Sequence, residues 1–403
     1  RMSRNLARFG TDSLDQVRIV LDRARLRGME AFLSFRMNEL HDVDKPESPL
    51  LGDFWKAHPE WRVGGYAGWG KEALNYAVPE VRAYFYSLVR EALERYDMDG
   101  FELDFMRFPY YFPMKPDSMT HFAGILTDFV GRVRGVVDSI SVARGHRILL
   151  TARVPSSLKG CAYLGVDPAT WCTKGMIDVL AIAPFLSTEN DINAREFKAV
   201  CGPVPVYAAQ EFTMGNRQMT RREKRATAAL HYANGADGIY LFNYFVAWDG
   251  GIEPDLEVLH ELIDPSLLEG KDKLYSLAPA WFPVPGVSLT SQLPLALRKA
   301  QLETVELRVK ESMPPRTLVL RIECKEDMEP EDVVVFFNGI RLQDGHMPAV
   351  PQIFPEKVVR QLPDVKKSVE FSVEPSLLQG LNRIGIHAQK AMTVEYVYLG
   401  LTK

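Results

Sequence analysis

Residues 12–265 repeat one unit, in which a stretch with apolar residues three or four positions apart leads through a Gly or Asp turn into a short apolar run. Apolar residues three or four positions apart are typical of amphipathic helices. The short runs, several of which alternate apolar and polar residues, predict strands. Strands that alternate with helices at this interval indicate a parallel sheet. We therefore expect an α/β fold for this part of the chain.

The strand-like runs number seven and lie at residues 30–38, 73–77, 101–105, 147–154, 176–185, 204–211 and 237–244. A closed (β/α)8 barrel, the TIM barrel, needs eight strands. We therefore number the seven runs as the second to the eighth strand, and expect the first among residues 1–10 or upstream of Arg1. An open doubly wound sheet is the alternative, but no Gly-rich phosphate-binding loop follows any of these runs. The pattern favours the barrel.

Several helix boundaries carry local signals. Asp12 or Ser13 is expected to begin the first helix, and Gly28 to end it. Pro79 stands at the first turn of a helix that leads to the third of these short apolar runs. The sequence Thr220-Arg-Arg-Glu223 matches a capping box at the start of the helix between the last two strands.

The pattern changes after residue 265. Four prolines between residues 265 and 288 predict a linker over 266–288, between a barrel domain at 1–265 and a second domain at 289–403. The second domain has period two throughout, with turns such as Asn338-Gly339, which predicts an antiparallel β-sandwich. Three roles are open for this sandwich: a carbohydrate-binding module, a packing partner for the barrel, or a spacer.

The fourth predicted strand carries two acids. Glu102 and Asp104 are two residues apart, so both side chains point to one face of the strand, and the apolar residues between and beside them point to the other. Burial of two neighbouring acids is costly without strong compensation. Acids near the C-terminal end of a barrel strand therefore indicate a catalytic strand. The alternative is a buried acid that is paired with an arginine for structure.

The C-terminal ends of the predicted strands, where TIM-barrel enzymes have their active sites, carry further polar residues. No histidine ends a strand, which argues against a His-based hydrolase and a His-rich metal site, and His41 is expected to be a loop residue. Acids, amides, arginines and aromatic rings together suit a sugar, because paired carboxylates are the working groups of glycoside hydrolysis. The candidates are Arg36, Asn38, Asn75, Tyr76, Glu102, Asp104, Arg107, Arg153, Glu211 and Asn243.

Two further groups of residues are open to alternative interpretations. The arginines at the strand ends either neutralise the carboxylates or bind a uronate or sulfate group of the substrate, since Arg forms bidentate pairs with such anions. The loop after residue 38 holds Trp55, Trp61 and Trp69, which we expect to line the substrate cleft. Packing within the loop is the alternative, and for Trp61 it is the favoured one.

The composition excludes several other classes of protein. The net charge of −4 gives no indication of a nucleic-acid partner, and no apolar run is long enough to span a membrane. The four cysteines lack metal-binding spacing and are expected to be free thiols, with a Cys161–Cys172 disulfide as the alternative. We expect no metal and no cofactor. A carbohydrate is the expected partner, and the oligomeric state is not predicted.

Residues 55–110 resemble a known family. The run His58-Pro-Glu-Trp61, followed by Leu74-Asn-Tyr-Ala77 and Pro79-Glu-Val-Arg82, leads to Tyr96-Asp-Met-Asp-Gly100 and Phe105-Met-Arg-Phe-Pro109. This series is similar to that of the glycosyl-hydrolase-like family 10 group, which has a comparable series before its fourth strand. The resemblance implies a TIM-barrel, glycosidase-like protein, mostly bacterial, for which a periplasmic or secreted location is expected.

The resemblance also implies roles for two acids. In the large clan of retaining barrel glycosidases, the acid/base ends the fourth strand and the nucleophile ends the seventh. Asp104 and Glu211 match these positions, although that clan normally has Asn-Glu where this chain has Leu103-Asp104. We expect Glu211 as nucleophile and Asp104 as proton donor. The alternatives are the reverse assignment, an ion pair of Glu211 with an arginine, and a non-catalytic carbohydrate-binding protein on a degenerate barrel.

Overall fold

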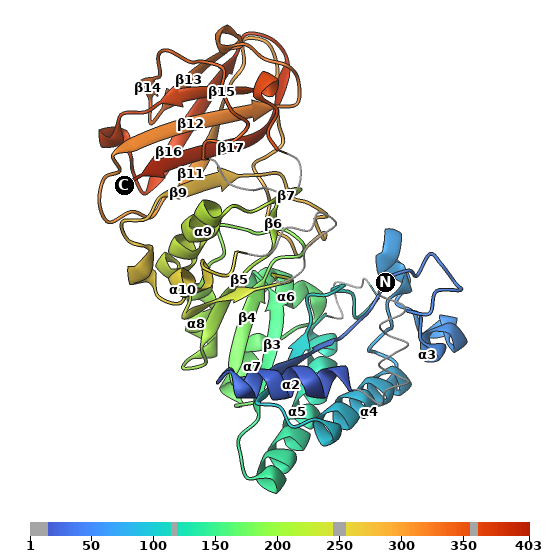
Figure 1. Cartoon of the computed structure of the whole chain (residues 1–403). Helices are drawn as coiled ribbons and strands as arrows, with labels where there is room; N and C mark the ends of the chain where they lie inside the picture. Colours follow the sequence, from blue (N-terminus) through green and yellow to red (C-terminus); the bar gives the residue numbers. More distant parts are fainter. Residues whose placement is uncertain (1–14, 114–118, 245–254, 355–361) are drawn as a thin grey trace. The chain divides into compact units, whose positions relative to one another are not determined.

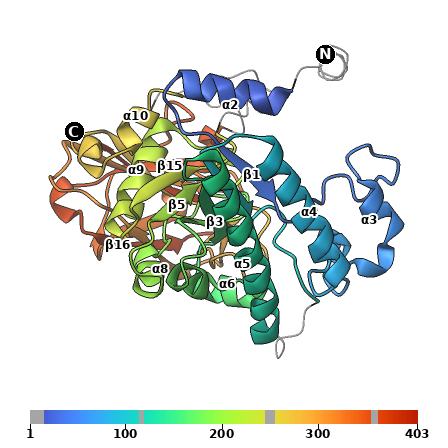
Figure 2. The same ribbon diagram turned by 90° about the horizontal axis from the view of Figure 1, so that it is seen from below.

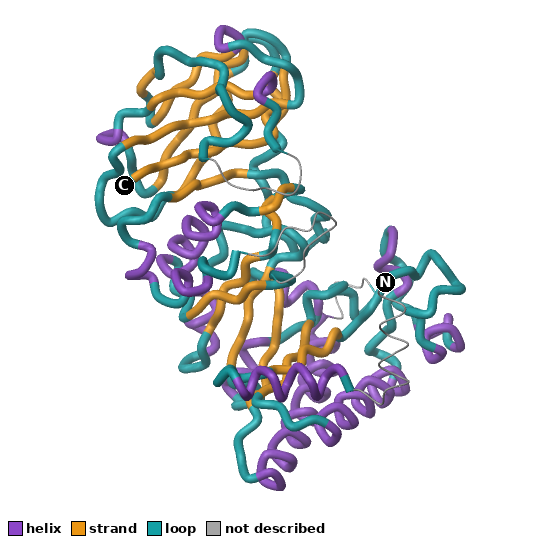
Figure 3. Tube along the Cα trace, in the orientation of Figure 1, coloured by secondary structure: helices purple, strands orange, loops and turns teal. Residues whose placement is uncertain are grey.

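The computed structural model describes residues 15–113, 119–244, 255–354 and 362–403 (Figure 1). The chain divides into two units, of which the first comprises Arg1–Ile182 with Glu196–Val206 and the second comprises Ala183–Arg195 with Tyr207–Lys403. Helices and strands alternate in the first unit, whereas the C-terminal part of the second unit is mostly strand and loop (Figure 3). The domain boundaries expected near residues 265 and 288 stay predictions.

Six strands form one sheet in the order β1-β2-β3-β4-β5-β8, and the pairs with a described register are parallel. This sheet confirms the α/β class that the alternating pattern predicts. Each strand falls on one of the predicted runs. Their bounds are β1 (Phe32–Arg36), β2 (Gly100–Asp104), β3 (Leu149–Pro155), β4 (Val179–Ala183), β5 (Val206–Gln210) and β8 (Gly238–Leu241).

The strand predicted at residues 73–77 is absent, and this prediction is wrong. β1 pairs directly with β2 in the sheet. The backbone of 73–77 bonds to loops instead, because the N–H of Asn75 donates to the carbonyl of Trp61 and that of Tyr76 to the carbonyl of Tyr111. The Asn75 side chain also accepts the N–H of Ala77 at 2.9 Å, which turns the chain. The alternation of apolar and polar residues in this segment therefore serves a turn.

The sheet is open, so the prediction of a closed barrel is wrong. Among the described residues, the strand order begins at β1 and ends at β8, and these two strands do not pair with each other. The structure thus shows an open parallel sheet of six strands where we expected eight in a closed ring. The first strand that we expected among residues 1–10 lies outside the described residues.

Helices α4 (Pro79–Arg95) and α5 (Met119–Arg144) lie side by side (Figure 2). The ring of Phe35 in β1 stacks on Phe101 of β2 at 6.2 Å and meets Phe85 of α4 edge-on at 6.1 Å. The apolar face of β2 therefore packs toward a helix, which leaves its acidic face on the other side of the sheet. The other helices are α2 (Gln16–Leu26), α3 (Asp53–Ala57), α6 (Leu158–Leu164), α7 (Pro168–Thr173), α8 (Ala194–Cys201), α9 (Arg221–Ala233) and α10 (Leu259–Leu262).

The N-terminal ends of α2 and α9 can be compared with the predicted helix starts. Helix α2 begins at Gln16, and Asp15 is its N-cap, whose carboxylate accepts the N–H groups of Val17 and Arg18. The starts predicted at Asp12 or Ser13 lie outside the described residues. The capping box of α9 is confirmed, because the side chains of Thr220 and Glu223 each bond to the backbone of the other residue.

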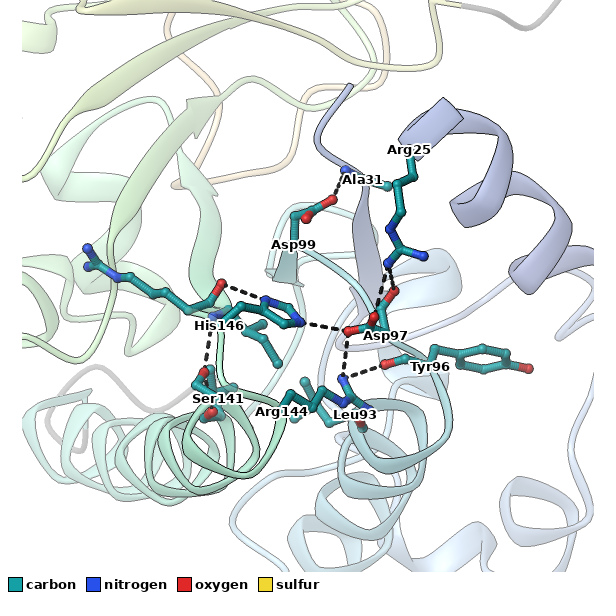
Figure 4. Close-up of polar contacts among 12 residues, drawn as sticks. Arg25, Ala31, Leu93, Tyr96, Asp97, Asp99, Ser141, Arg144 and His146 are labelled. Carbon is teal, nitrogen blue, oxygen red and sulfur yellow. Dashed lines mark hydrogen bonds and ion pairs between the residues drawn. The ribbon is translucent and has the colours of Figure 1, made fainter. Parts of the chain in front are cut away.

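A polar cluster around Asp97 ties the N-terminal ends of β2 and β3 to the helices (Figure 4). Asp97 accepts hydrogen bonds from Arg25 at 3.1 Å and from His146 at 2.7 Å. Arg144 of α5 donates to the carbonyl groups of Leu93, Glu94 and Tyr96 at the C-terminal end of α4. The hydrogen bond to His146 lowers the pKa of Asp97, and the same bond raises the pKa of His146. Because this cluster lies at the strand ends opposite to Asp104, we assign it a structural role.

Two antiparallel sheets in the second unit form the predicted β-sandwich. One has the order β10-β17-β12-β15, with β9 also paired to β17, and the other has the order β11-β16-β13-β14. Fully buried residues of both sheets, such as Ile322 and Ile386, share one core. Asn338-Gly339 forms the predicted two-residue turn between β13 and β14, with both residues at positive φ.

The strands of the sandwich extend beyond the segment expected for it. Residues 266–288, expected as a linker, hold β9, which pairs with β17. A short hairpin of β6 (Thr213–Met214) and β7 (Arg217–Gln218) precedes α9. The sandwich strands are β9 (Lys273–Leu277), β10 (Leu295–Leu297), β11 (Leu302–Arg308), β12 (Thr317–Cys324), β13 (Val333–Phe337), β14 (Ile340–Arg341), β15 (Ser368–Ser372), β16 (Leu381–Ala388) and β17 (Met392–Thr402).

Candidate active site

The acidic face of β2 is continued by polar residues on both neighbouring strands, and we call this surface the polar face of strands β1–β3. Residues that are opposite each other in a parallel register point to the same face of the sheet. Two rows of three polar residues result, one of them at the C-terminal ends of β1 and β2. The rows are Ser34, Glu102 and Thr151, and then Arg36, Asp104 and Arg153.

Asp104 lies at the centre of the second row and is held from two sides. Its side chain and that of Arg153 are each only 1% exposed. Arg153 Nη1 lies 3.0 Å from Oδ1 of Asp104 and 3.2 Å from Oδ2. The backbone N–H groups of Met106 and Arg107 donate to Oδ1 at 2.8 and 3.0 Å. The structure therefore places a buried carboxylate, paired with an arginine, at the C-terminal end of β2. Such a pair is what the structural alternative predicts, and the catalytic role of Asp104 stays a prediction.

Glu102 lies one row deeper on the same face. Its side chain is buried, and Oε1 accepts a hydrogen bond from Ser34 Oγ at 2.6 Å. This position, two residues before Asp104 on the strand, agrees with the expectation that both acids share one face. Glu102 is thus placed to orient the groups around Asp104.

A chain of contacts connects the end of β1 to the loop after β2. Arg36 donates to Glu39 at 2.6 Å, Glu39 contacts Nδ1 of His41, and Nε2 of His41 lies 2.7 Å from Nη2 of Arg107. Burial raises the pKa of Glu39, but hydrogen bonds from the His41 backbone and from Arg36 outweigh this effect, so that the pKa is lowered. Glu39 and His41 were missed as site residues, although the acidic loop directly after β1 is a signal that could have found them.

Asn38, Asn75 and Tyr76 use their polar groups within the loops. Asn38 is 1% exposed, donates to the carbonyls of Leu74 and Tyr110, and accepts the N–H of Leu74. The hydroxyl of the fully buried Tyr76 donates to the carbonyl of Met37, and burial raises its pKa well above the usual value. These contacts position the loop that follows β1. Substrate binding by the three residues stays a prediction.

The three tryptophans of this loop differ in their surroundings. Trp55 donates to the carbonyl of Glu72 at 2.8 Å, and Trp61 stacks on His58 at 3.5 Å. Both therefore pack the loop together, which for Trp61 is the favoured interpretation. Trp69 is 48% exposed and meets Phe108 edge-on at 6.3 Å, next to Arg107. Trp69 is thus the tryptophan of this group that can offer a ring to a ligand.

Glu211 and Asn243 belong to the second unit. Glu211 follows β5 and is buried, and its backbone is clamped by Thr188, whose hydroxyl accepts the Glu211 N–H at 2.9 Å and donates to the Glu211 carbonyl at 3.1 Å. Asn243 lies in the turn after β8 with a φ of +51°, a conformation that Asn tolerates better than most residues. The catalytic pairing of Asp104 with Glu211 stays a prediction.

All four cysteines are buried and free, as predicted. In the described ranges, no group of three or more His, Cys, Asp or Glu side chains is arranged to hold a metal ion. No helix among the described residues has both the length and the apolar character that a membrane span requires.

No protein family model matches the chain, and no curated protein matches it. Among solved structures, a cycloisomaltooligosaccharide glucanotransferase from a Paenibacillus species is 8% identical, with a TM-score of 0.32, over 94% of this chain and 47% of that chain. The glycoside hydrolase domain of PgaB from Bordetella bronchiseptica is 12% identical, with a TM-score of 0.39, over 59% of this chain and 76% of that chain. An α-amylase from Geobacillus thermoleovorans is 12% identical, with a TM-score of 0.34, over 93% of this chain and 81% of that chain.

The chain spans about half the length of the first of these proteins. At such identities and TM-scores, no residue role and no substrate transfers from them to this chain. The resemblance to glycosyl-hydrolase-like family 10 stays a prediction.

Proposed function

We propose that this chain is a glycoside hydrolase that acts on a poly- or oligosaccharide, with Asp104 and Glu211 as its two carboxylates. The observation that carries the proposal is the polar face of strands β1–β3, on which Asp104 ends a buried strand between two arginine-bearing strands. Acids and arginines at the C-terminal ends of parallel strands are the arrangement from which TIM-barrel enzymes build active sites. Paired carboxylates are in turn the groups that cleave glycosidic bonds.

The partner of Asp104 bears on the assignment of roles. Arg153 contacts both oxygens of Asp104, an arrangement that stabilises a charged carboxylate. This contact favours Asp104 as the nucleophile, with Glu211 or Glu189 as the proton donor. The opposite assignment, in which Asp104 donates the proton to the leaving group, requires Arg153 to release at least one oxygen.

The first test is hydrolysis of a panel of plant and algal polysaccharides, with and without uronate or sulfate groups, followed by the release of reducing ends. We expect Asp104→Asn and Glu211→Gln each to lower kcat by about 10²–10⁴-fold. Glu94→Gln, which changes a half-exposed acid on α4, is the matched control and should leave kcat unchanged. Near wild-type activity of both acid variants contradicts the proposal, and so does the absence of hydrolysis across the panel.

A second test separates the two role assignments. Asp104→Gly and Glu211→Gly are assayed with an activated glycoside in the presence of azide, and the anomer of the glycosyl azide is determined. Azide that replaces a missing nucleophile gives the inverted anomer, whereas azide that attacks a glycosyl-enzyme intermediate gives the retained anomer. An inverted product from Asp104→Gly assigns it as the nucleophile. If azide rescues neither variant, the retaining mechanism is refuted.

Arg36 supports a further proposal on the substrate. Its side chain is 41% exposed at the end of β1, whereas that of Arg153 is buried against Asp104. We therefore assign charge neutralisation to Arg153 and the binding of a uronate or sulfate group to Arg36. Arg36→Gln is expected to raise KM several-fold for anionic members of the panel and to leave KM for neutral members unchanged. An equal change for both groups contradicts this role.

One observation favours a second candidate function, that of a non-catalytic carbohydrate-binding protein. Asp104 is only 1% exposed, and its two oxygens accept hydrogen bonds from Arg153 and from two backbone N–H groups. Such a carboxylate can serve the fold alone. Binding of a glycan from the panel without any hydrolysis would decide for this candidate.

A further inference from the structure

We propose that a groove in the second unit binds an uncharged sugar ring of a glycan, with Trp281 as its platform and Asp191 as an acceptor for sugar hydroxyl groups. The groove lies along the loop after β4, the end of β9 and residues 288–292. This inference deepens the proposed function and rests on it for the class of ligand. All residues that line the groove belong to the second unit.

Two hydrogen bonds hold the walls of the groove together. The groove contains about 680 Å³ of space, open solvent included. Asn190 on one wall donates to the carbonyl of Ser276 in β9 at 2.8 Å. The N–H of Leu289 donates to Glu189 Oε1 at 3.0 Å. These bonds cross-link the two walls, so little conformational freedom is lost when a ligand binds.

The lining combines one aromatic platform with many hydroxyl groups. Trp281 is half-buried and lines the groove. The apolar face of an indole suits the C–H face of a pyranose ring. Asp191 has 54% of its side chain exposed, and Arg308 lies 3.3 Å from one of its oxygens. That contact leaves acceptor capacity on the carboxylate for sugar hydroxyl groups. The hydroxyl side chains along the groove are Ser187, Thr188, Ser276, Ser288, Thr290 and Ser291.

The charge of the lining selects among sugars. Of the described residues that line the groove, the ionisable ones are Glu189 and Asp191, and none is basic. Glu189 disfavours a phosphate, sulfate or uronate group in the groove, whereas Arg308 offsets part of the charge of Asp191. Both carboxylates accept hydrogen bonds from neutral hydroxyl groups. The groove therefore suits an uncharged sugar, in contrast to the exposed Arg36 at the end of β1.

The position of the groove connects it to Glu211. Thr188 lines the groove and forms both hydrogen bonds that clamp the Glu211 backbone. Thr188 therefore joins the wall of the groove to the segment that carries Glu211. In a substrate that Glu211 cleaves, we assign the groove as a subsite for an uncharged unit beyond the bond that is cleaved.

The test measures binding separately from hydrolysis. The full chain with Asp104→Asn, or with Asp104→Glu should the first variant not fold, is titrated calorimetrically with malto-, cello-, xylo- and manno-oligosaccharides, and with oligogalacturonates as the anionic arm. We expect at least one neutral oligosaccharide to bind, and Trp281→Ala to weaken that binding about tenfold or more. Trp281→Phe should restore most of the affinity, and Asp191→Asn should weaken it several-fold.

Tyr207→Ala is the matched control, because Tyr207 is an exposed aromatic residue of the second unit that does not line the groove. Its affinity should stay at the parent level. The proposal is overturned if no neutral oligosaccharide binds, if Trp281→Ala binds like the parent, or if only oligogalacturonates respond to the change. Hydrolysis with a KM that is insensitive to Trp281 would refute the groove and leave the hydrolase standing. Binding that depends on Trp281 in the absence of any hydrolysis would support the groove and refute the hydrolase.

Discussion

A buried histidine in the second unit leads to a quantitative prediction for acid stability. His231 is fully buried near the end of α9, and Nε2 lies 2.9 Å from the carbonyl oxygen of Glu189. Nε2 therefore carries the proton of the neutral ring, and Nδ1 has no hydrogen-bond partner in the described part of the chain. A proton on Nδ1 would place a charge in the core, so burial lowers the pKa from 6.5 to about 4.

The direction and size of the pH effect follow from this difference. Between about pH 6.5 and pH 4 the unfolded chain binds a proton at this residue and the folded chain does not, so the free energy of unfolding falls as the pH falls. The full shift is worth about 3 kcal/mol, of which about 2 kcal/mol is lost between about pH 7.5 and pH 5. His231→Gln retains a donor for the Glu189 carbonyl and cannot take up a proton. This variant should lose about 2 kcal/mol less than the wild type over the same interval.

The assay is urea unfolding followed by far-UV circular dichroism at both pH values. The compared quantity is the change in the free energy of unfolding between them, which cancels any pH-independent cost of the substitution. His260→Gln, at an exposed histidine on α10, is the control and should behave like the wild type. The reasoning is refuted if His231→Gln loses as much stability as the wild type, or if the control shows the same reduction in pH sensitivity.

Three further changes test other contacts. Asp104→Asn should lower the free energy of unfolding by about 3–5 kcal/mol, because it leaves the buried Arg153 charge without its partner; full stability by thermal denaturation would contradict the ion pair. Asp97→Asn should cost less than about 1 kcal/mol, since its partner His146 is partly exposed. The pair of Asp97 and His146 stabilises the fold most between about pH 4 and 6.5. Because the pKa of His146 is raised, the contribution of His146 is lost as the pH rises above this interval. Because the pKa of Asp97 is lowered, the contribution of Asp97 is lost as the pH falls below it. A loss for Asp97→Asn that grows above about pH 8 would refute this. Glu323→Gln should destabilise the second unit by about 3 kcal/mol, because Arg217 makes two bonds to this buried carboxylate. An unchanged urea midpoint would count against it.

Features that depend on neighbours in the sequence could be predicted. The capping box at Thr220 and Glu223 and the turn at Asn338-Gly339 each depend on residues a few positions apart, whose backbone geometry is local. The shared face of Glu102 and Asp104 follows from the period of a strand, which is the same wherever the strand lies. The α/β alternation and the antiparallel sandwich follow from the same two periods.

Partners across the fold could not be predicted, because they depend on which distant segments meet. Alternation at residues 73–77 suggested a strand, but Asn75 turns the chain there and the backbone bonds to loops, so the sheet has six described strands and is open. Asn38 is polar at a strand end, and only the folded loops show that its amide holds the backbone of Leu74 and Tyr110.

The same distinction separates the residues of the candidate site. The sequence alone determined that two acids share one face of a buried strand, because side-chain direction is a property of the local backbone. The tertiary structure decided that Arg153 holds Asp104 and that Glu39 and His41 connect Arg36 to Arg107. These contacts join residues of separate strands and loops, and their formation depends on strand register and burial, which no spacing along a single segment determines.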